Sequence, residues 1–146
     1  MVRIYDNTAI ASVPPNYAST NDVYAPISAE NQSAILSALL LVKPLETKIW
    51  IDSQEPRRGA LGRQIQDAFI KGGFTTAQIV DKPNFSGWSI PAQWVTTNGI
   101  QIVMQDNPDQ SMLNAMGRLC LSVGSQPSVI AGRDTPAQLM IIVRNQ

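Results

Sequence analysis

Two polar segments of the chain carry the side chains best suited to chemistry, and each directly follows an apolar run. The first segment follows the apolar run 48–51 and the second follows 99–104. In open α/β sheets, ligands bind beyond the carboxyl ends of the strands, so these segments predict a binding site if both runs are strands. The candidate ligand-binding residues are Asp52, Ser53, Arg57, Arg58, Asp106 and Asn107.

The first segment, SQEPRR at 53–58, precedes an expected helix that begins at Pro56. A helix N-terminus near arginines suits a nucleotide phosphate or another anion. However, the chain contains neither GxGxxG nor GxxxxGK[ST], the two common phosphate-binding patterns. Solvated surface arginines are the more frequent explanation. An anion site in the loop 52–59 is kept as the alternative hypothesis.

Asp52 and Asp106 end their apolar runs and together suggest a third hypothesis, a carboxylate-based enzyme. Paired carboxylates bind Mg²⁺ or act as acid and base. Aspartates at such places more often cap the next helix or shape the turn, and no third ligand or nucleophile is in view. The DNPD segment at 106–109 lacks the spacing of an EF-hand loop. We therefore predict no metal site and rank this hypothesis last.

The chain has no histidine and a single cysteine, Cys120. The missing histidine excludes Ser-His-Asp and Cys-His catalysis and removes the commonest zinc ligand. A lone cysteine forms no disulfide within the chain. Cys120 lies on an apolar helical stripe, which predicts a core position and no catalytic role. No cofactor is expected, and a non-enzymatic role is favoured.

The composition predicts one folded domain. The chain has 146 residues, 44% of them hydrophobic and 15% charged, with eleven basic and eleven acidic side chains. Because there is no positive excess, no nucleic-acid partner is expected. The longest apolar run, at 34–42, is too short to span a membrane, and no signal peptide is visible. We expect a cytoplasmic protein; a membrane anchor on a longer parent chain stays open.

Hydrophobic periodicity predicts an α/β fold with three helices and five to six strands. Helices are expected over 29–42, from Pro56 to the Gly72-Gly73 stop, and from the DNPD segment to Gly124. In the first helix, Ile35, Leu36, Leu39 and Leu40 recur at helical spacing. Strands are expected at 2–5, 48–52, 74–80, 99–105, 128–131 and 138–143.

Residues 48–80 and 99–131 share one layout, a strand, a helix and a second strand, and predict two similar units in one three-layer-like sheet. The direction of the last strand is not readable. Residues 1–27 read as an N-terminal arm and 28–146 as a single domain. A long connection at 81–98 contains Trp88 and Trp94.

Several segments together resemble a loosely defined group of bacterial α/β domains of unknown function, often attached to membrane-anchored proteins. They are the helix ending in Leu-Val-Lys-Pro-Leu, the strand 48–52, the helix 61–73 with Gln64, Ala68 and Gly73, and the strand 99–103 with the helix after it. The likeness covers roughly 29–144. It implies the fold and brings no catalytic residue.

These observations favour a non-enzymatic module that binds another protein or itself. The arm at 1–27 favours self-association, because arms that do not pack a core are often exchanged between subunits. The alternative is a domain that senses or sequesters a small nucleotide or anion at the loop 52–59.

Overall fold

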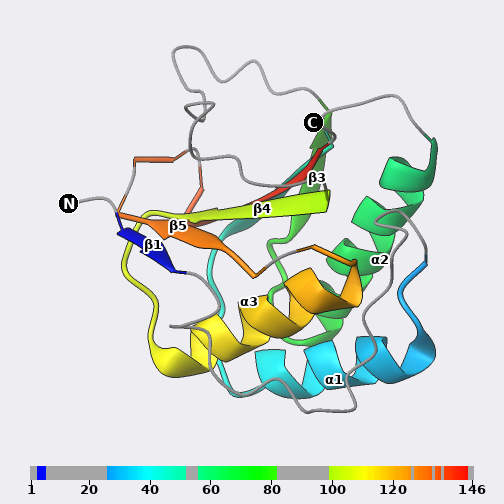
Figure 1. The fold of residues 1–146 in the computed structure, drawn as a ribbon, viewed down its shortest axis with the longest axis horizontal. Coiled ribbons are helices and arrows are strands. Elements are labelled where there is room, and N and C mark those ends of the chain that lie inside the picture. Colours follow the sequence, from blue (N-terminus) through cyan, green and yellow to red (C-terminus); the bar gives the residue numbers. More distant parts are fainter. Residues whose placement is uncertain are drawn as a thin grey trace.

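The computed structural model describes residues 3–5, 26–51, 56–81, 99–125, 127–132, 134–135 and 137–144, and forms the predicted α/β fold (Figure 1). The helices are α1 (Ala29–Leu39), α2 (Pro56–Lys71) and α3 (Gln110–Ser122). The strands are β1 (Arg3–Tyr5), β2 (Thr47–Ile51), β3 (Gln78–Asp81), β4 (Gly99–Met104), β5 (Val129–Ala131) and β6 (Leu139–Arg144).

The six strands form one mixed sheet with the order β1-β5-β4-β6-β2-β3. The last strand of the chain, β6, therefore lies inside the sheet between the two predicted units, β2–α2–β3 and β4–α3–β5. It runs parallel to β2 and antiparallel to β4. The two units consequently run in opposite directions on either side of β6.

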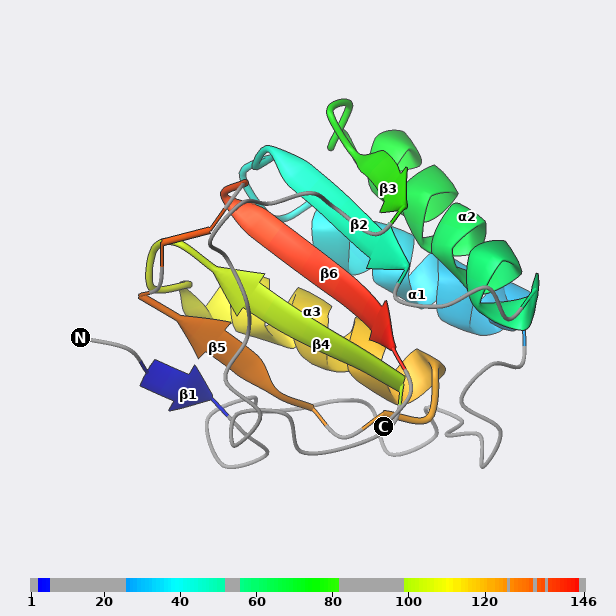
Figure 2. The ribbon, with the colours of Figure 1, turned by 90° about the horizontal axis from the view of Figure 1, so that it is seen from above.

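All three helices cover the same face of the sheet (Figures 1 and 2). Strand–helix–strand crossovers between parallel strands are right-handed. The strands of β2–α2–β3 run opposite to those of β4–α3–β5, and the two units extend from β6 toward opposite edges of the sheet. A rotation of 180° about an axis perpendicular to the sheet, here called the half turn, therefore relates the two units. That half turn keeps α2 and α3 on one face. The described helices therefore make one layer on the sheet, and the predicted three-layer arrangement is not formed by them.

The central strand β6 is buried on both faces. Leu139, Ile141 and Val143 join the core beneath the helices, while Met140 and Ile142 join a second apolar cluster on the opposite face. A strand buried on both sides reads as a continuous apolar run, which explains the sequence LMIIV.

Helices α1 and α2 meet closely where α2 ends. A Cβ atom at Gly72 would lie 2.8 Å from the Cβ of Leu39, so only glycine allows this approach. Gly73 has a φ of +97°, and the N–H of Phe74 donates to the carbonyl of Phe69 at 2.8 Å. This turn is a glycine-based helix stop. A second turn follows, in which the N–H of Ala77 donates to the carbonyl of Phe74 at 3.1 Å, so β3 begins at Gln78, later than the predicted 74.

The first helix also ends earlier than predicted, at Leu39, with Leu40 as its C-cap. The N–H groups of Leu41 and Val42 donate to the carbonyls of Ala38 and Leu39, both at 3.1 Å, in a tighter final turn. Leu40 itself keeps the helical bond, from its N–H to the carbonyl of Leu36 at 3.1 Å. It lies one turn beyond the half-buried Leu36, beside the buried face of α1 and not on it. Leu40 is 64% exposed.

Within the predicted arm, the described residues are attached to the domain. Strand β1 pairs antiparallel with β5 at one edge of the sheet. Ile27 is buried, and its N–H donates to Oε1 of Gln64 at 2.9 Å. Trp88 and Trp94 lie outside the described residues.

Candidate functional site

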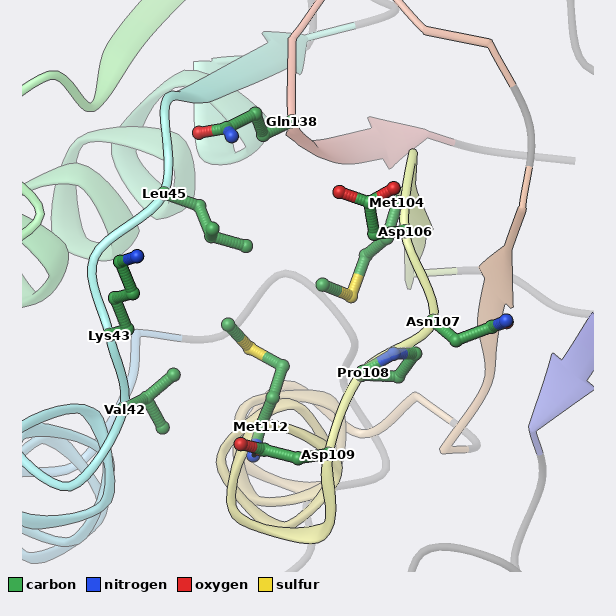
Figure 3. A pocket seen from close by; sticks show the side chains of 10 residues that line it. All are labelled: Val42, Lys43, Leu45, Met104, Asp106, Asn107, Pro108, Asp109, Met112 and Gln138. Carbon is green, nitrogen blue, oxygen red and sulfur yellow. Dashed lines mark hydrogen bonds between the residues drawn. The ribbon is translucent and has the colours of Figure 1, made fainter.

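A cavity of about 140 Å³ lies beyond the carboxyl end of β4 (Figure 3). Because β4 runs antiparallel to β6, the same place is also the start of β6. The α1–β2 connection and the first turn of α3 complete the walls. We call this space the β4-end cavity and define it by Leu45, Met104, Met112, Lys43, Asp106 and Gln138.

The interior of the β4-end cavity is apolar. Figure 3 shows the side chains of Leu45, Met104 and Met112 pointing into the space. Met104 is the last residue of β4 and Met112 lies in the first turn of α3; each is only 3% exposed. Methionine side chains are flexible and polarisable, so this lining adapts to apolar groups of different shape.

Two opposite charges lie on opposite sides of the rim. Lys43 comes from the α1–β2 connection, and Asp106 follows β4 on the opposite wall (Figure 3). Both residues are exposed. Among the described residues, neither side chain forms an ion pair or a hydrogen bond. The rim therefore presents a cation and an anion on either side of an apolar floor.

Gln138, just before β6, holds the start of this strand against the segments before β2 and after β4. Its side-chain oxygen accepts the N–H of Glu46 at 2.9 Å, and its backbone carbonyl accepts the N–H of Gln105 at 3.1 Å. The N–H of Leu139 donates to the carbonyl of Glu46 at 3.0 Å. These bonds hold the segments before β2 and after β4 at a set distance.

The helix α3 is capped by Asp109, three residues after Asp106. The carboxylate of Asp109 accepts the N–H of Met112 at 2.8 Å. The expectation that Asp106 caps this helix is therefore wrong: its side chain faces the cavity. Asn107 borders the cavity, but its side chain points toward β1, and its Oδ1 accepts the hydroxyl of Tyr5 at 3.3 Å.

The strands that precede the two predicted binding segments, β2 and β4, end at opposite ends of the sheet. Asp52 and Ser53 lie outside the described residues, as do the side chains of Arg57 and Arg58 at the start of α2. Ile51, just before Asp52, is aligned through Val143 with Ile100.

Ile100 lies four residues before Met104, or about 13 Å along the strand at ~3.3 Å per residue. Because β2 and β4 run in opposite directions, their carboxyl ends lie at opposite ends of the sheet. Asp52 itself lies outside the described residues, so its pairing with Asp106 stays a prediction.

Cys120 lies in the core, as its position on the α3 stripe predicts. Burial away from water raises the pKa of its thiol to about 12. The nucleophilic thiolate is therefore absent near neutral pH. Within the described part of the chain, no group of three or more His, Cys, Asp or Glu side chains could hold a metal ion.

A second surface lies at the end of α1. Leu40 and Leu41 are 64% and 79% exposed. Next to Leu41, a groove of about 140 Å³ runs between α1 and α3, bordered by Ser37, Ala38, Ser111, Asn114 and Arg118. The guanidinium Nη1 of Arg118 donates to the carbonyl of Ala34 at 3.4 Å and ties the two helices together. We call this the α1–α3 groove.

Sequence reasoning missed the α1–α3 groove because it placed Leu40 on the same apolar stripe as Leu39, whereas Leu40 lies beside that stripe. The signal that was available is the run Leu39–Val42 immediately before Pro44. Four successive apolar residues exceed what one face of a helix can bury, so some of them must face outward.

None of the protein-family models, curated proteins or solved structures compared with the chain matches it. The resemblance to bacterial α/β domains therefore stays a prediction. None of the helices in the described ranges is long and apolar enough to cross a membrane.

Proposed function

We propose that this protein is a non-enzymatic protein-binding module and that its contact surface is Leu40 and Leu41 together with the α1–α3 groove. The observation that carries the proposal is the exposure of two adjacent leucines, at 64% and 79%, beside a groove of about 140 Å³.

The apolar contribution comes from the two leucines. Fully burying one leucine side chain contributes about 1.5–3 kcal/mol. Single exposed apolar residues are ordinary, but neighbouring ones next to a groove mark an interaction surface. A partner that covers both Leu40 and Leu41 removes a contiguous apolar patch from water.

The groove adds selectivity. Ala38 provides a small side chain at its floor, and the exposed Ser37 and the side chains of Ser111 and Asn114 provide polar borders. Interfaces commonly place an apolar anchor in a central pocket surrounded by a polar rim. We expect the partner to insert one apolar side chain beside Leu41.

The residue chemistry supports a binding role over catalysis. The chain contains no histidine, and the only cysteine is buried with a raised pKa. The two carboxylates that could have formed a catalytic pair follow strands of opposite direction. A second copy of the chain is one partner that the surface could accept.

A photo-crosslinking amino acid placed at Ser37 tests the proposal in cells that express the protein. We expect one discrete adduct, and its mass identifies the partner: twice the chain mass means self-association. The same crosslinker at Gln78, an exposed residue of β3 on a different part of the surface, is the matched control.

The Leu40→Ser/Leu41→Ser double variant should remove the Ser37 adduct, because the apolar area that drives binding is gone. The Ile70→Ser variant changes an isoleucine of α2 that is 43% exposed, and it should leave the Ser37 adduct unchanged. An adduct that survives the double variant, or that forms equally from Gln78, would contradict the proposal.

A further inference from the structure

We propose that the β4-end cavity binds a small zwitterion with an apolar side chain, such as a free α-amino acid of the size of leucine or phenylalanine. This site is separate from the α1–α3 groove and goes beyond the proposed protein-binding role. It also lies away from the loop 52–59, where the sequence predicted a small ligand.

The size of the cavity sets the apolar part of the ligand. Its volume is about 140 Å³. Apolar protein cavities of about 150 Å³ hold a benzene molecule. An isobutyl or benzyl group therefore fits between Leu45, Met104 and Met112, whose side chains point into the space (Figure 3).

The rim sets the polar part of the ligand. Lys43 and Asp106 lie on opposite walls and, among the residues the structure describes, neither has an ion-pair or hydrogen-bond partner. A carboxylate group suits the Lys43 ammonium, and an ammonium group suits the Asp106 carboxylate. An α-amino acid carries both groups at one end of an apolar side chain, so it satisfies both walls at once.

The other polar groups of the site are already engaged, which narrows the ligand further. The Asp109 carboxylate accepts the N–H of Met112, and the side-chain oxygen of Gln138 accepts the N–H of Glu46. Lys43 and Asp106 are the charged side chains of the described lining that form no such bond, while Asp109 keeps its negative charge. A phosphate or nucleotide would meet two carboxylates and a single lysine here, so the charge balance disfavours it.

Backbone amide NMR shifts of the full chain, titrated with three compounds, test the proposal. The compounds are leucine, 3-methylbutylamine, which lacks the carboxylate, and 4-methylpentanoate, which lacks the ammonium group. We expect saturable binding of leucine with a Kd of about 1 mM. The shifts should concentrate at residues 43–45, 104–106 and 112. Each analogue should bind at least about fivefold more weakly, because one charge-assisted contact is missing.

Two exposed variants assign the charges without disturbing the core. Asp106→Asn should weaken leucine binding by about fivefold and leave 4-methylpentanoate unchanged. Lys43→Gln should weaken leucine binding similarly and leave 3-methylbutylamine unchanged. Glu30→Gln, at an exposed acid on α1, is the matched control and should have no effect.

Three results would overturn the proposal. The first is no saturable shift with leucine or phenylalanine at tens of millimolar. The second is an analogue that binds as tightly as leucine, which would show that one charge of the rim plays no part. The third is unchanged leucine affinity in both Asp106→Asn and Lys43→Gln.

Discussion

Asp109 is the residue that joins the cavity to the helix behind it. Its carboxylate caps α3 by accepting the N–H of Met112, and Met112 in turn forms part of the cavity interior. Loss of an aspartate N-cap costs about 0.5–2 kcal/mol. We expect Asp109→Ala to lower the free energy of unfolding by about 1 kcal/mol in urea denaturation.

Asp106→Ala is the matched control for this cap. It changes an exposed aspartate in the same loop that makes no capping bond. A surface change of this kind shifts the free energy of unfolding by less than about 0.5 kcal/mol. Equal losses in the two variants would mean that the cap does not stabilise α3.

Cys120 makes stability depend on alkaline pH. Burial raises the pKa of its thiol from 9.0 to about 12 in the folded chain. Between these values the unfolded chain releases the thiol proton and the folded chain keeps it. Stability is therefore complete below about pH 9 and falls as the pH rises toward 12, by up to about 1.4 kcal/mol per pH unit.

The measurement compares the pH dependence of unfolding in the wild type and in Cys120→Ala. Lysines and tyrosines titrate in the same range in both proteins, so only the difference in slope reports Cys120. We expect the shallower slope in Cys120→Ala above pH 9. Identical slopes would show that the thiol ionises without unfolding.

At the scale of the elements, Gly72 sets how closely α1 and α2 approach. A Cβ atom there would lie 2.8 Å from the Cβ of Leu39, which is fully buried and cannot rotate away. We expect Gly72→Ala to destabilise the fold by about 1–3 kcal/mol through overpacking. Thermal or urea unfolding measures this change.

Gly59, within α2, is a glycine at which an added Cβ atom has room. A Cβ atom at Gly59 would meet only Nη1 of Arg63 at 3.6 Å, an ordinary contact. Because alanine favours a helix over glycine, Gly59→Ala should stabilise the protein by up to about 1 kcal/mol. If both variants moved stability in the same direction, the close contact between Gly72 and Leu39 would not be the cause.

The helices and strands could be predicted from the sequence where local residue patterns determine them. The periodicity of α3, the apolar runs of β2, β4 and β6, and the glycine stops at Gly73 and Gly124 predicted the correct element types. The C-terminal end of α1 and the start of β3 were predicted a few residues off. There, the tight final turn after α1 and the turn between Phe74 and Ala77 carry apolar residues outside the regular elements.

The arrangement of the candidate site was less accessible to sequence reasoning. Asp106 was predicted as a binding residue, and it does face a cavity. Lys43, Leu45 and Gln138 were not predicted as site residues. Lys43 and Leu45 lie about 60 residues before Asp106 and Gln138 lies 32 residues after it, so only the sheet order brings them together. The opposite directions of β2 and β4 were not predicted for the same reason: strand direction is set by long-range pairing, which no local pattern encodes.

For the whole molecule, the half turn that relates the two units explains where sites can form. It places the carboxyl end of β4 and the carboxyl end of β2 at opposite ends of the sheet, each beside the start of a helix. The β4-end cavity is closed by the start of β6 and by the α1–β2 connection. The single strand β6 starts at the carboxyl end of β4 and ends near the carboxyl end of β2. The two ends of the sheet therefore differ, because the start of β6 lines a cavity at only one of them.

The central position of β6 also predicts how the molecule unfolds. Both units depend on β6, because β2 pairs with one of its edges and β4 with the other. Neither unit can keep its sheet position once β6 leaves, so we expect one cooperative transition. Amide hydrogen exchange of Ile49 in β2 and Ile102 in β4 should report the same free energy of opening.

Ile141→Ala tests this coupling, because Ile141 is fully buried in β6 and pairs with Ile49 on one side and Ile102 on the other. Truncating a buried isoleucine costs about 2–5 kcal/mol. The protection of Ile49 and Ile102 should fall by the same amount, whereas Ile70→Ala, at a partly exposed position of α2, should change both little. If only β2 or only β4 lost protection, the two units would unfold independently. Such a result would contradict the inference that β6 joins them into one cooperative domain.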